Sequence, residues 1–484
     1  VRFERQSDRE SLLGMRFLIW SIGLWLFAPT LLGGEQPGHW PQFRGPNGSG
    51  VALHSDMPVV FGPKTNAIWR TDLPLGHSSP CVWDQKIFLT GIDDGKLETL
   101  CLDRADGKIV WRRSVAPERI DPGSRNGSAA NSTPATDGQR VYVYFGSFGL
   151  LCYDFAGNEL WRKPLPIPIT QHGASTSPIL VDDFLILACD QDIGAYLLAV
   201  NRRTGETSWR VERAGFRRGF STPMLWQEGD RKQLIVVGTL RVVAYQPKNG
   251  AELWRVLGLP NEMCSTPVAG GGLLFVAGWT HGSGVSRMPL FESLLEAGDQ
   301  NMDAKLTRAE APAGPARQHF LYIDADKDGF IDRGEYDALA EIFNKSQNAL
   351  LAIRPGGQGD VTATHVAWKQ TRGLPYVPSP LYYRDRLYLV KNGGIASCFN
   401  ASNGAALYQE ERLGALGDYY SSPVAANGKI CVGSQQGVIV VFTAGDTLNV
   451  LARNDLGESI MATPAIVDNK LYVRTERHLY AFGE

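Results

Sequence analysis

The chain has 484 residues, of which 43% are hydrophobic and 20% are charged. Lys and Arg number 48 against 50 Asp and Glu, a net charge of −2, which excludes the basic excess typical of proteins that bind nucleic acid or anionic membrane surfaces. The 7 cysteines are dispersed without a CxxC pair, and their odd number excludes a fully paired disulfide framework.

Residues 15–34 have the features of an export signal. Met15 and Arg16 precede a largely apolar run from Phe17 to Leu32, which ends in two glycines. This run is shorter than the ~20 apolar residues that a membrane-spanning helix needs. We therefore expect export to the periplasm, the cell surface or the medium. An uncleaved N-terminal anchor is the alternative, and it would be the only membrane contact.

After a leader, residues 35–66, a short signature recurs along the chain. It is a serine or threonine followed by proline, and successive prolines lie 41–54 residues apart except for one interval of 113 residues. A period of this size indicates one supersecondary unit that is repeated. The eight copies are Ser79-Pro80, Thr133-Pro134, Ser177-Pro178, Thr222-Pro223, Thr266-Pro267, Ser379-Pro380, Ser422-Pro423 and Thr463-Pro464.

Each unit also contains alternating strands and closes with a turn that is followed by an aromatic residue. Strand patterns such as residues 140–145 follow the Ser/Thr-Pro signatures, and turns with a central polar-Gly pair favour tight hairpins. We expect the aromatic residue after each turn to pack on the neighbouring unit rather than to stack on a ligand. The clearest copies of this ending are residues 102–111, 153–161, 200–209 and 245–254, with a weaker copy at 399–408.

Four strands in each of eight units predict an all-β fold, an eight-bladed β-propeller of four-stranded blades. It would occupy residues 67–280 and 349–484. The last unit ends before its outermost strand. Residues 66–71 have the pattern of such an outer strand, so we expect them to complete the last blade and close the ring.

The 113-residue interval predicts an insert, residues 281–348, in the fifth blade. It contains the complete EF-hand loop pattern, with ligands at positions 1, 3, 5, 7, 9 and 12 and Gly329 at the sharp turn. Because a hard cation needs six to eight oxygens, this spacing predicts a Ca²⁺ site. The alternative is an acidic solvated loop. The predicted ligands are Asp324, Asp326, Asp328, the carbonyl of Phe330, Asp332 and Glu335.

A second loop, residues 299–310, has the same pattern except that Ala304 replaces the glycine. A left-handed turn at alanine costs about 1 kcal/mol, so we expect a weaker Ca²⁺ site or a structural loop without metal. Helical spacing at residues 289–296, 316–322 and 336–343 predicts flanking helices, and Ile331 is expected to join a strand between the loops. The insert is therefore predicted to be a small α-helical EF-hand pair. The second set of ligands is Asp299, Asn301, Asp303, Lys305, Thr307 and Glu310.

Residues that directly precede the Ser/Thr-Pro signatures are expected to line a funnel on the propeller axis. This ring is polar and mixed in sign, so it predicts a site for a small polar ligand or an unknown protein partner, or a hydrated channel. Sequence spacing alone assigns no catalytic pair. The candidates are His77, Asn131, His172, Arg218, Glu262, Tyr376, Asp418 and Glu458.

The repeat, with its Gly-x-x-x-Trp endings, resembles the propeller repeat of pyrroloquinoline-quinone (PQQ) proteins over residues 67–279 and 349–484. The stretch Trp40–Gly50 also resembles the leader of bacterial exported members. One branch of this family, the quinoprotein dehydrogenases, implies a quinone between a Trp and a disulfide of adjacent cysteines. It also implies calcium in the channel held by Glu, Asn and Asp. The other branch is cofactor-free and includes the propeller lipoprotein that assists outer-membrane protein assembly.

The resemblance and the residues together favour the second branch. The chain has no adjacent cysteines, and the predicted Ca²⁺ loops lie on an insert away from the axis. We expect an exported, monomeric, calcium-binding propeller that serves as a non-catalytic binding or scaffold protein of the cell envelope. A PQQ-dependent dehydrogenase of alcohols or sugars is the alternative, with PQQ as a possible but less favoured cofactor. No catalytic residue is predicted.

Overall fold

The computed structural model describes residues 38–120, 127–170, 172–283 and 288–483. The predicted export signal, residues 15–34, lies outside the described residues. In the part that is described, no helix has the length and apolar character needed to cross a membrane.

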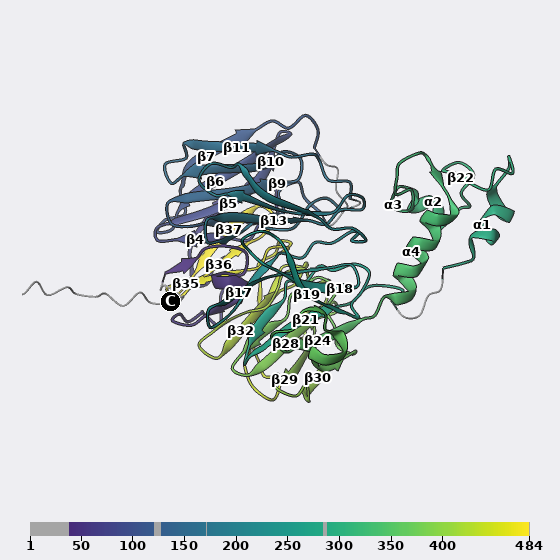
Figure 1. Cartoon of the computed structure of the whole chain (residues 1–484). Helices are drawn as coiled ribbons and strands as arrows, with labels where there is room; N and C mark the ends of the chain where they lie inside the picture. Colours follow the sequence, from purple (N-terminus) through teal and green to yellow (C-terminus); the bar gives the residue numbers. More distant parts are fainter. Residues whose placement is uncertain (1–37, 121–126, 171, 284–287, 484) are drawn as a thin grey trace, which may run out of the picture. The chain divides into compact units, whose positions relative to one another are not determined.

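The described chain forms eight four-stranded antiparallel blades of a β-propeller, as the repeat predicted (Figure 1). In each of the first seven blades the strands follow one another outward from the axis in chain order. The first four blades are β4 (Cys81–Trp83), β5 (Lys86–Asp93), β6 (Lys96–Asp103) and β7 (Ile109–Val115); β8 (Ala135–Thr136), β9 (Arg140–Phe145), β10 (Gly149–Asp154) and β11 (Glu159–Pro164); β12 (Ile179–Val181), β13 (Phe184–Cys189), β14 (Tyr196–Asn201) and β15 (Thr207–Glu212); and β16 (Met224–Glu228), β17 (Arg231–Gly238), β18 (Arg241–Tyr245) and β19 (Glu252–Leu257). The other four are β20 (Val268–Gly270), β21 (Leu273–Gly278), β24 (Ala349–Ile353) and β26 (Val366–Gln370); β27 (Leu381–Tyr383), β28 (Arg386–Lys391), β29 (Ile395–Asn400) and β30 (Ala406–Arg412); β31 (Val424–Ala426), β32 (Lys429–Gly433), β33 (Val438–Thr443) and β34 (Val450–Asp455); and β35 (Ala465–Val467), β36 (Lys470–Arg474), β37 (His478–Phe482) and β3 (Ala67–Asp72).

The core lies between the blades. The two middle strands of a blade are apolar on both faces because each face is covered by a neighbouring blade; in β9, every residue after Arg140 is buried. The outermost strand, in contrast, alternates between partly buried and exposed residues, as in β11. The sequence patterns of middle and outer strands differ for this reason.

In five blades the tryptophan of the outermost strand packs on the turn of the next blade, as predicted. Trp161, for example, donates its indole N–H to the carbonyl oxygen of Arg202 at 3.1 Å and covers Gly205 in the turn of the following blade. Trp69, Trp111, Trp209 and Trp368 make the corresponding bonds to the carbonyls of Arg104, Phe155, Pro247 and Ala401. Trp254 instead donates to the side chain of Gln233 within its own blade.

The N-terminal segment closes the ring, and the leader adds two more strands. β3 pairs with β37 and completes the eighth blade, as predicted. Ahead of it, β1 (His39–Trp40) pairs antiparallel with β4 of the first blade, and β2 (Val51–Ala52) pairs parallel with β31 of the seventh. The short helix η1 (Pro46–Gly48) lies between them. The leader is therefore part of the folded propeller.

The insert connects β21 to β24 of the fifth blade, where the sequence placed it (Figure 1). The predicted pairing of its two loops is observed, since Leu306 lies opposite Ile331. The helical segment predicted over residues 316–322 is present, but His319 leaves helical geometry and divides it into two short helices. The elements of the insert are α1 (Phe291–Gly298), β22 (Leu306–Thr307), α2 (Pro315–Gln318), α3 (Phe320–Ile323), β23 (Phe330–Ile331) and α4 (Arg333–Lys345).

The fifth blade departs from the repeat at its outer turn. Between β24 and β26 the chain forms α5 (Thr362–His365) and β25 (Gly359–Asp360), and β25 pairs parallel with β19 of the fourth blade. β25 therefore lies along the outer edge of the fourth blade, beside Trp254. Trp254 is the tryptophan whose indole bonds within its own blade.

Candidate functional site

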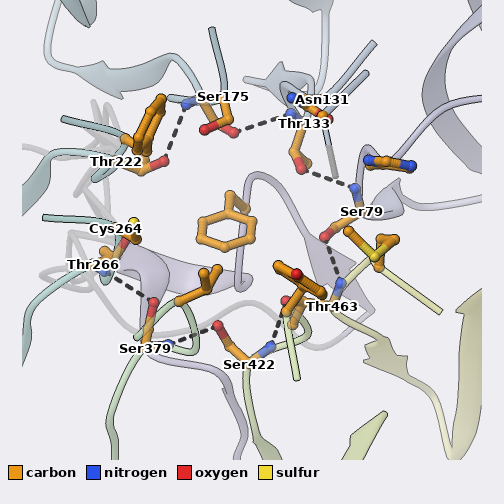
Figure 2. A pocket seen from close by; sticks show the side chains of 18 of the residues that line it. Ser79, Asn131, Thr133, Ser175, Thr222, Cys264, Thr266, Ser379, Ser422 and Thr463 are labelled. Atoms are coloured by element: carbon orange, nitrogen blue, oxygen red, sulfur yellow. Dashed lines mark hydrogen bonds between the residues drawn. The ribbon is translucent and has the colours of Figure 1, made fainter. Parts of the chain in front are cut away.

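The Ser/Thr-Pro signatures form a belt of hydrogen bonds around the propeller axis. In this belt the backbone N–H of one signature donates to the side-chain hydroxyl of the signature in the next blade, at 2.9–3.1 Å (Figure 2). A serine or threonine is needed because its hydroxyl is short enough to accept within the crowded centre of the ring. Seven links join Ser79 to Thr133, Thr133 to Ser177, Ser177 to Thr222, Thr266 to Ser379, Ser379 to Ser422, Ser422 to Thr463, and Thr463 back to Ser79.

The leader crosses the axis just beside this belt. Because β1 runs antiparallel to β4, the chain after Trp40 continues toward the start of β4, where the belt lies. The carbonyl of Pro41 accepts from Thr136 in the second blade, and Arg44 donates to the carbonyl of Pro380 in the sixth at 2.7 Å. Arg44 is fully buried, which lowers its pKa to about 9. The leader therefore bridges blades on opposite sides of the ring.

A cavity of about 210 Å³ lies on the axis and includes one belt residue from each blade. Its remaining lining comes from the leader and from residues that precede the belt; the described lining contains no Lys, Arg, Asp or Glu. Phe43 of the leader lies in its wall. Besides the belt, the lining residues are Phe43, His77, Gly127, Asn131, His172, Ser175, Phe220, Cys264, Tyr376, Val377, Tyr420 and Met461.

Four of the eight predicted funnel residues line this cavity: His77, Asn131, His172 and Tyr376. Burial, reinforced by the charge of nearby Arg474, lowers the pKa of His77 to about 4 despite a side-chain hydrogen bond with Asn131. Burial also lowers the pKa of His172. The imidazoles at the cavity thus favour their neutral forms, in which each ring offers one donor and one acceptor.

Two further predicted residues, Arg218 and Glu262, form an ionic network next to the cavity. Arg218 makes a bidentate pair with Asp192, with both N–O distances 2.8 Å, and lies 3.8 Å from a carboxylate oxygen of Glu262. Glu262 also accepts a 2.7 Å hydrogen bond from the Tyr376 hydroxyl. Burial raises the pKa of Tyr376, and the nearby carboxylate of Glu262 adds to this effect. These charges are paired with one another, so they fix the shape of the funnel wall.

The remaining two candidates lie outside the cavity. Asp418 is exposed, and Glu458 pairs with His478 and accepts a hydrogen bond from Thr475 in its own blade. Although both residues precede a Ser/Thr-Pro signature, they do not meet each other in a site at the axis.

A second candidate site lies in the insert. Asp324, Asp326 and Asp328 offer carboxylate oxygens that all lie within 4.8 Å of one another. Asp324 is only 3% exposed, and its Oδ1 atom has no hydrogen-bond partner. Glu335 closes the loop, since its carboxylate accepts from the backbone N–H groups of Asp326 and Asp332 at 3.2 Å. This arrangement could hold a hard cation.

The partner loop has a similar path. Ala304 adopts the left-handed conformation (φ 62°) and donates its N–H to Asp299 at 3.0 Å. The Oδ1 atom of Asp299 is buried without a partner, and Glu310 accepts from both the N–H and the hydroxyl of Thr307. The left-handed turn predicted at alanine is therefore present.

Sequence reasoning missed several contributors to the funnel, among them Phe43, Cys264 and Asp192. Phe43 lies in a leader without strand-like alternation, and Cys264 stands in a stretch that otherwise resembles strand or turn. Asp192 is the partner of Arg218 from a hairpin 26 residues away in sequence. The position two residues before a Ser/Thr-Pro signature is a signal that could have found six lining residues: Ser175, Phe220, Cys264, Val377, Tyr420 and Met461.

The cavity does not fit a quinone of the PQQ type. PQQ is a tricarboxylate, and the described lining offers neither an Arg or Lys to bind its carboxylates nor an Asp or Glu to hold an accompanying metal. The two cysteines adjacent in sequence that such a site uses in the dehydrogenases are also lacking. The residues around the cavity therefore support no chemical step through such a group.

Comparison with known proteins places this fold among PQQ-like propellers. Solved structures similar to the chain include BamB from Moraxella catarrhalis (13% identity, TM-score 0.51, covering 86% of this chain and 98% of that one). A europium-containing methanol dehydrogenase is 11% identical with a TM-score of 0.58, covering 93% and 99%. The quinohemoprotein alcohol dehydrogenase from Comamonas testosteroni is 12% identical with a TM-score of 0.55, covering 92% and 81%. At these identities the likeness establishes the fold alone.

No curated protein matches the sequence. A family model does, however, and its description is "Outer membrane protein assembly factor BamB"; it matches residues 59–196, 194–288 and 344–483. These segments hold the propeller strands and omit residues 289–343, which form most of the insert. Since more than half of the chain is matched, the protein belongs to this PQQ-like, BamB-type propeller family.

Proposed function

We propose that the protein is an exported, calcium-binding propeller of the cell envelope that acts as a binding or scaffold module rather than as an enzyme. The observation that carries the calcium assignment is Asp324. A buried carboxylate oxygen without a hydrogen-bond donor is costly to fold, and a bound cation removes that cost.

The chemistry of the loop supports Ca²⁺ as that cation. Its ligands are oxygens, which a hard divalent ion prefers, and Glu335 can contribute both carboxylate oxygens from the first turn of α4. The capping box between Asp332 and Glu335 fixes the start of that helix, so the last ligand is held on a rigid element. Extracellular calcium modules bind at about 10⁻⁴–10⁻³ M, which suits a loaded, structural role.

The partner loop is proposed as the weaker site. The left-handed backbone at Ala304 costs about 1 kcal/mol that glycine would not incur. Asp299 is also less buried than Asp324.

The scaffold assignment is supported by the lining of the axial cavity and by the description of the matching family model. The leader contributes Phe43 to the lining of the axial cavity, and the described lining lacks the charged groups of a quinone site. The family model's description names an outer-membrane assembly factor, which favours an envelope role and a protein or small polar ligand as partner.

Calcium titration by calorimetry tests the metal assignment. The wild type should show one tighter binding event, and Glu335→Gln should lose it because a neutral amide replaces the bidentate carboxylate. Glu310→Gln, the matched change in the partner loop, should keep the tighter event. A Glu335→Gln variant that retains it would contradict the assignment of the ligands.

Reconstitution tests the scaffold assignment. Purified protein supplied with PQQ and calcium should not oxidise alcohols or sugars with an artificial electron acceptor. Robust turnover would replace the scaffold proposal with the quinone-dependent dehydrogenase, its runner-up.

A further inference from the structure

The insert emerges on the face of the propeller where the funnel opens. Consecutive strands of a blade are antiparallel, so the β21–β24 connection lies at the same end of the blades as the segments that lead into the innermost strands. Those segments carry the funnel residues, including Arg218 and Glu262. The insert is therefore rooted beside the funnel mouth.

Its first contact with the mouth is made by α3. The guanidinium group of Arg218 lies 4.7 Å from the ring centre of Tyr322, and that of Arg217 lies 5.9 Å from it. Tyr322 is only 7% exposed. Arg218 is held in place by its bidentate pair with Asp192, so the aromatic ring rests on a fixed cation.

Its second contact is made at the end of α4. The hydroxyl of Ser346, the residue after that helix, accepts from the backbone N–H of Asn261 at 2.9 Å and donates to the Asn261 side chain at 3.0 Å. Thr280 and Ser283, at the start of the insert, join the same buried cluster. Asn261 directly precedes Glu262, so both contacts converge on one part of the funnel wall.

The calcium loop connects these two contacts. Asp324, its first ligand, comes two residues after Tyr322, while Glu335, its last, stands in the first turn of the helix that leads to Ser346. A cation bound by both ends of the loop would fix α3 relative to α4. Without it, the loop carboxylates repel one another, and α3 and α4 are held together by the apolar core of the insert without the cation between them.

The ionic network of Arg218 connects the insert to the cavity. Arg218 approaches Glu262, and Glu262 accepts the hydroxyl hydrogen bond of Tyr376, which lines the cavity. We propose that calcium in the Asp324–Glu335 loop braces the insert across the funnel mouth, so that entry of small molecules to the axial cavity depends on calcium. The inference rests on the proposed calcium binding and adds to it the control of access.

Cys264 provides the readout. It lines the cavity and is partly exposed, whereas the other six cysteines are buried. The rate at which a small maleimide modifies Cys264 in the full chain, located by peptide mass, should rise at least about fivefold when a chelator replaces saturating calcium, the lower end of typical coupling between sites. Cys264→Ser should abolish the signal.

A matched pair of variants separates the contact between the insert and the funnel mouth from calcium binding itself. Tyr322→Leu keeps an apolar side chain in the insert core but removes the aromatic face, so it should bind calcium and yet label quickly with or without it. Tyr322→Phe keeps the ring over Arg218 and should label like the wild type. Ser346→Ala removes the hydroxyl that bonds to Asn261. Like Tyr322→Leu, it should raise the labelling rate of Cys264 in calcium.

The outcomes distinguish the two proposals. If calorimetry shows calcium binding but the labelling rate of the wild type is the same in calcium and in chelator, the brace is overturned and the calcium site stands. If no calcium binds, both proposals fall. Equal labelling of Tyr322→Leu and wild type in calcium would also overturn the brace.

Discussion

His77 shows how the funnel sets the chemistry of a single side chain. It is enclosed at the axis, near the cationic Arg474 and hydrogen-bonded to Asn131, and burial is the largest cause of its lowered pKa. Arg474 is itself fully buried and donates to Ser78 and Thr90, so its charge cannot move away. A protonated His77 would add a second cation to the same enclosed space.

This arrangement predicts acid sensitivity with a defined window. Folding lowers the His77 pKa from 6.5 to about 4, so between these values the unfolded chain binds more protons. The free energy of unfolding has its full value above pH 6.5 and falls by about 3 kcal/mol as the pH falls toward 4. Urea denaturation should show that His77→Gln flattens the slope of stability across this window.

The control for this prediction is His54, which is exposed. His54→Gln should keep the wild-type slope. If the slope survives unchanged in His77→Gln, the acid sensitivity belongs to other groups and the neutral imidazole has no part in it.

At the scale of elements, the turn glycines and the tryptophans of adjacent blades act as pairs. Gly205 has φ +75°, and a Cβ atom there would approach the Trp161 ring to 2.7 Å. Gly95 has a similar φ of +70°, but a Cβ atom there would meet nothing within 4 Å. The two glycines share the backbone requirement and differ only in the docked ring.

Alanine substitutions at these two positions should therefore separate backbone strain from blade packing. Gly95→Ala should cost about 1 kcal/mol, the penalty of a left-handed alanine. Gly205→Ala should lower the free energy of unfolding by ~1–3 kcal/mol more than Gly95→Ala does, because the ring of Trp161 must shift. Denaturant unfolding measures both, and equal losses would show that the indole adapts without strain.

These elements also show what the sequence could and could not predict. Spacing is local information, so the repeat, the loop of Asp324 and the completing strand β3 can all be predicted from it. The belt, the pair of Arg218 with Asp192, and the contact of Tyr322 with Arg218 join residues from different blades or from the insert. No periodicity encodes such contacts, because each depends on where the ring brings distant turns together.

On the scale of the whole molecule, the leader and the insert are both additions to the eight blades, but they are joined to the ring differently. The leader pairs with the first and seventh blades and buries Trp40, which is 1% exposed. The insert has its own apolar core, and its two ends meet at once, since Thr280 and Asn348 exchange hydrogen bonds of 2.8 and 3.2 Å. We therefore expect the propeller to lose little stability without the insert and much more without the leader.

Two deletions test this difference. Replacing residues 281–348 with a short linker should abolish calcium binding and leave the main unfolding transition within a few degrees of the wild type, since β21 and β24 rejoin as an ordinary hairpin. Removing residues 38–52 should lower the free energy of unfolding by at least about 3–5 kcal/mol, because truncation of one buried tryptophan alone costs that much. Calorimetric unfolding compares them directly. An insert deletion that fails to fold would show that the contacts of Tyr322 and Ser346 make insert and propeller one cooperative core, and the brace at the funnel mouth would then be a condition of folding rather than of access.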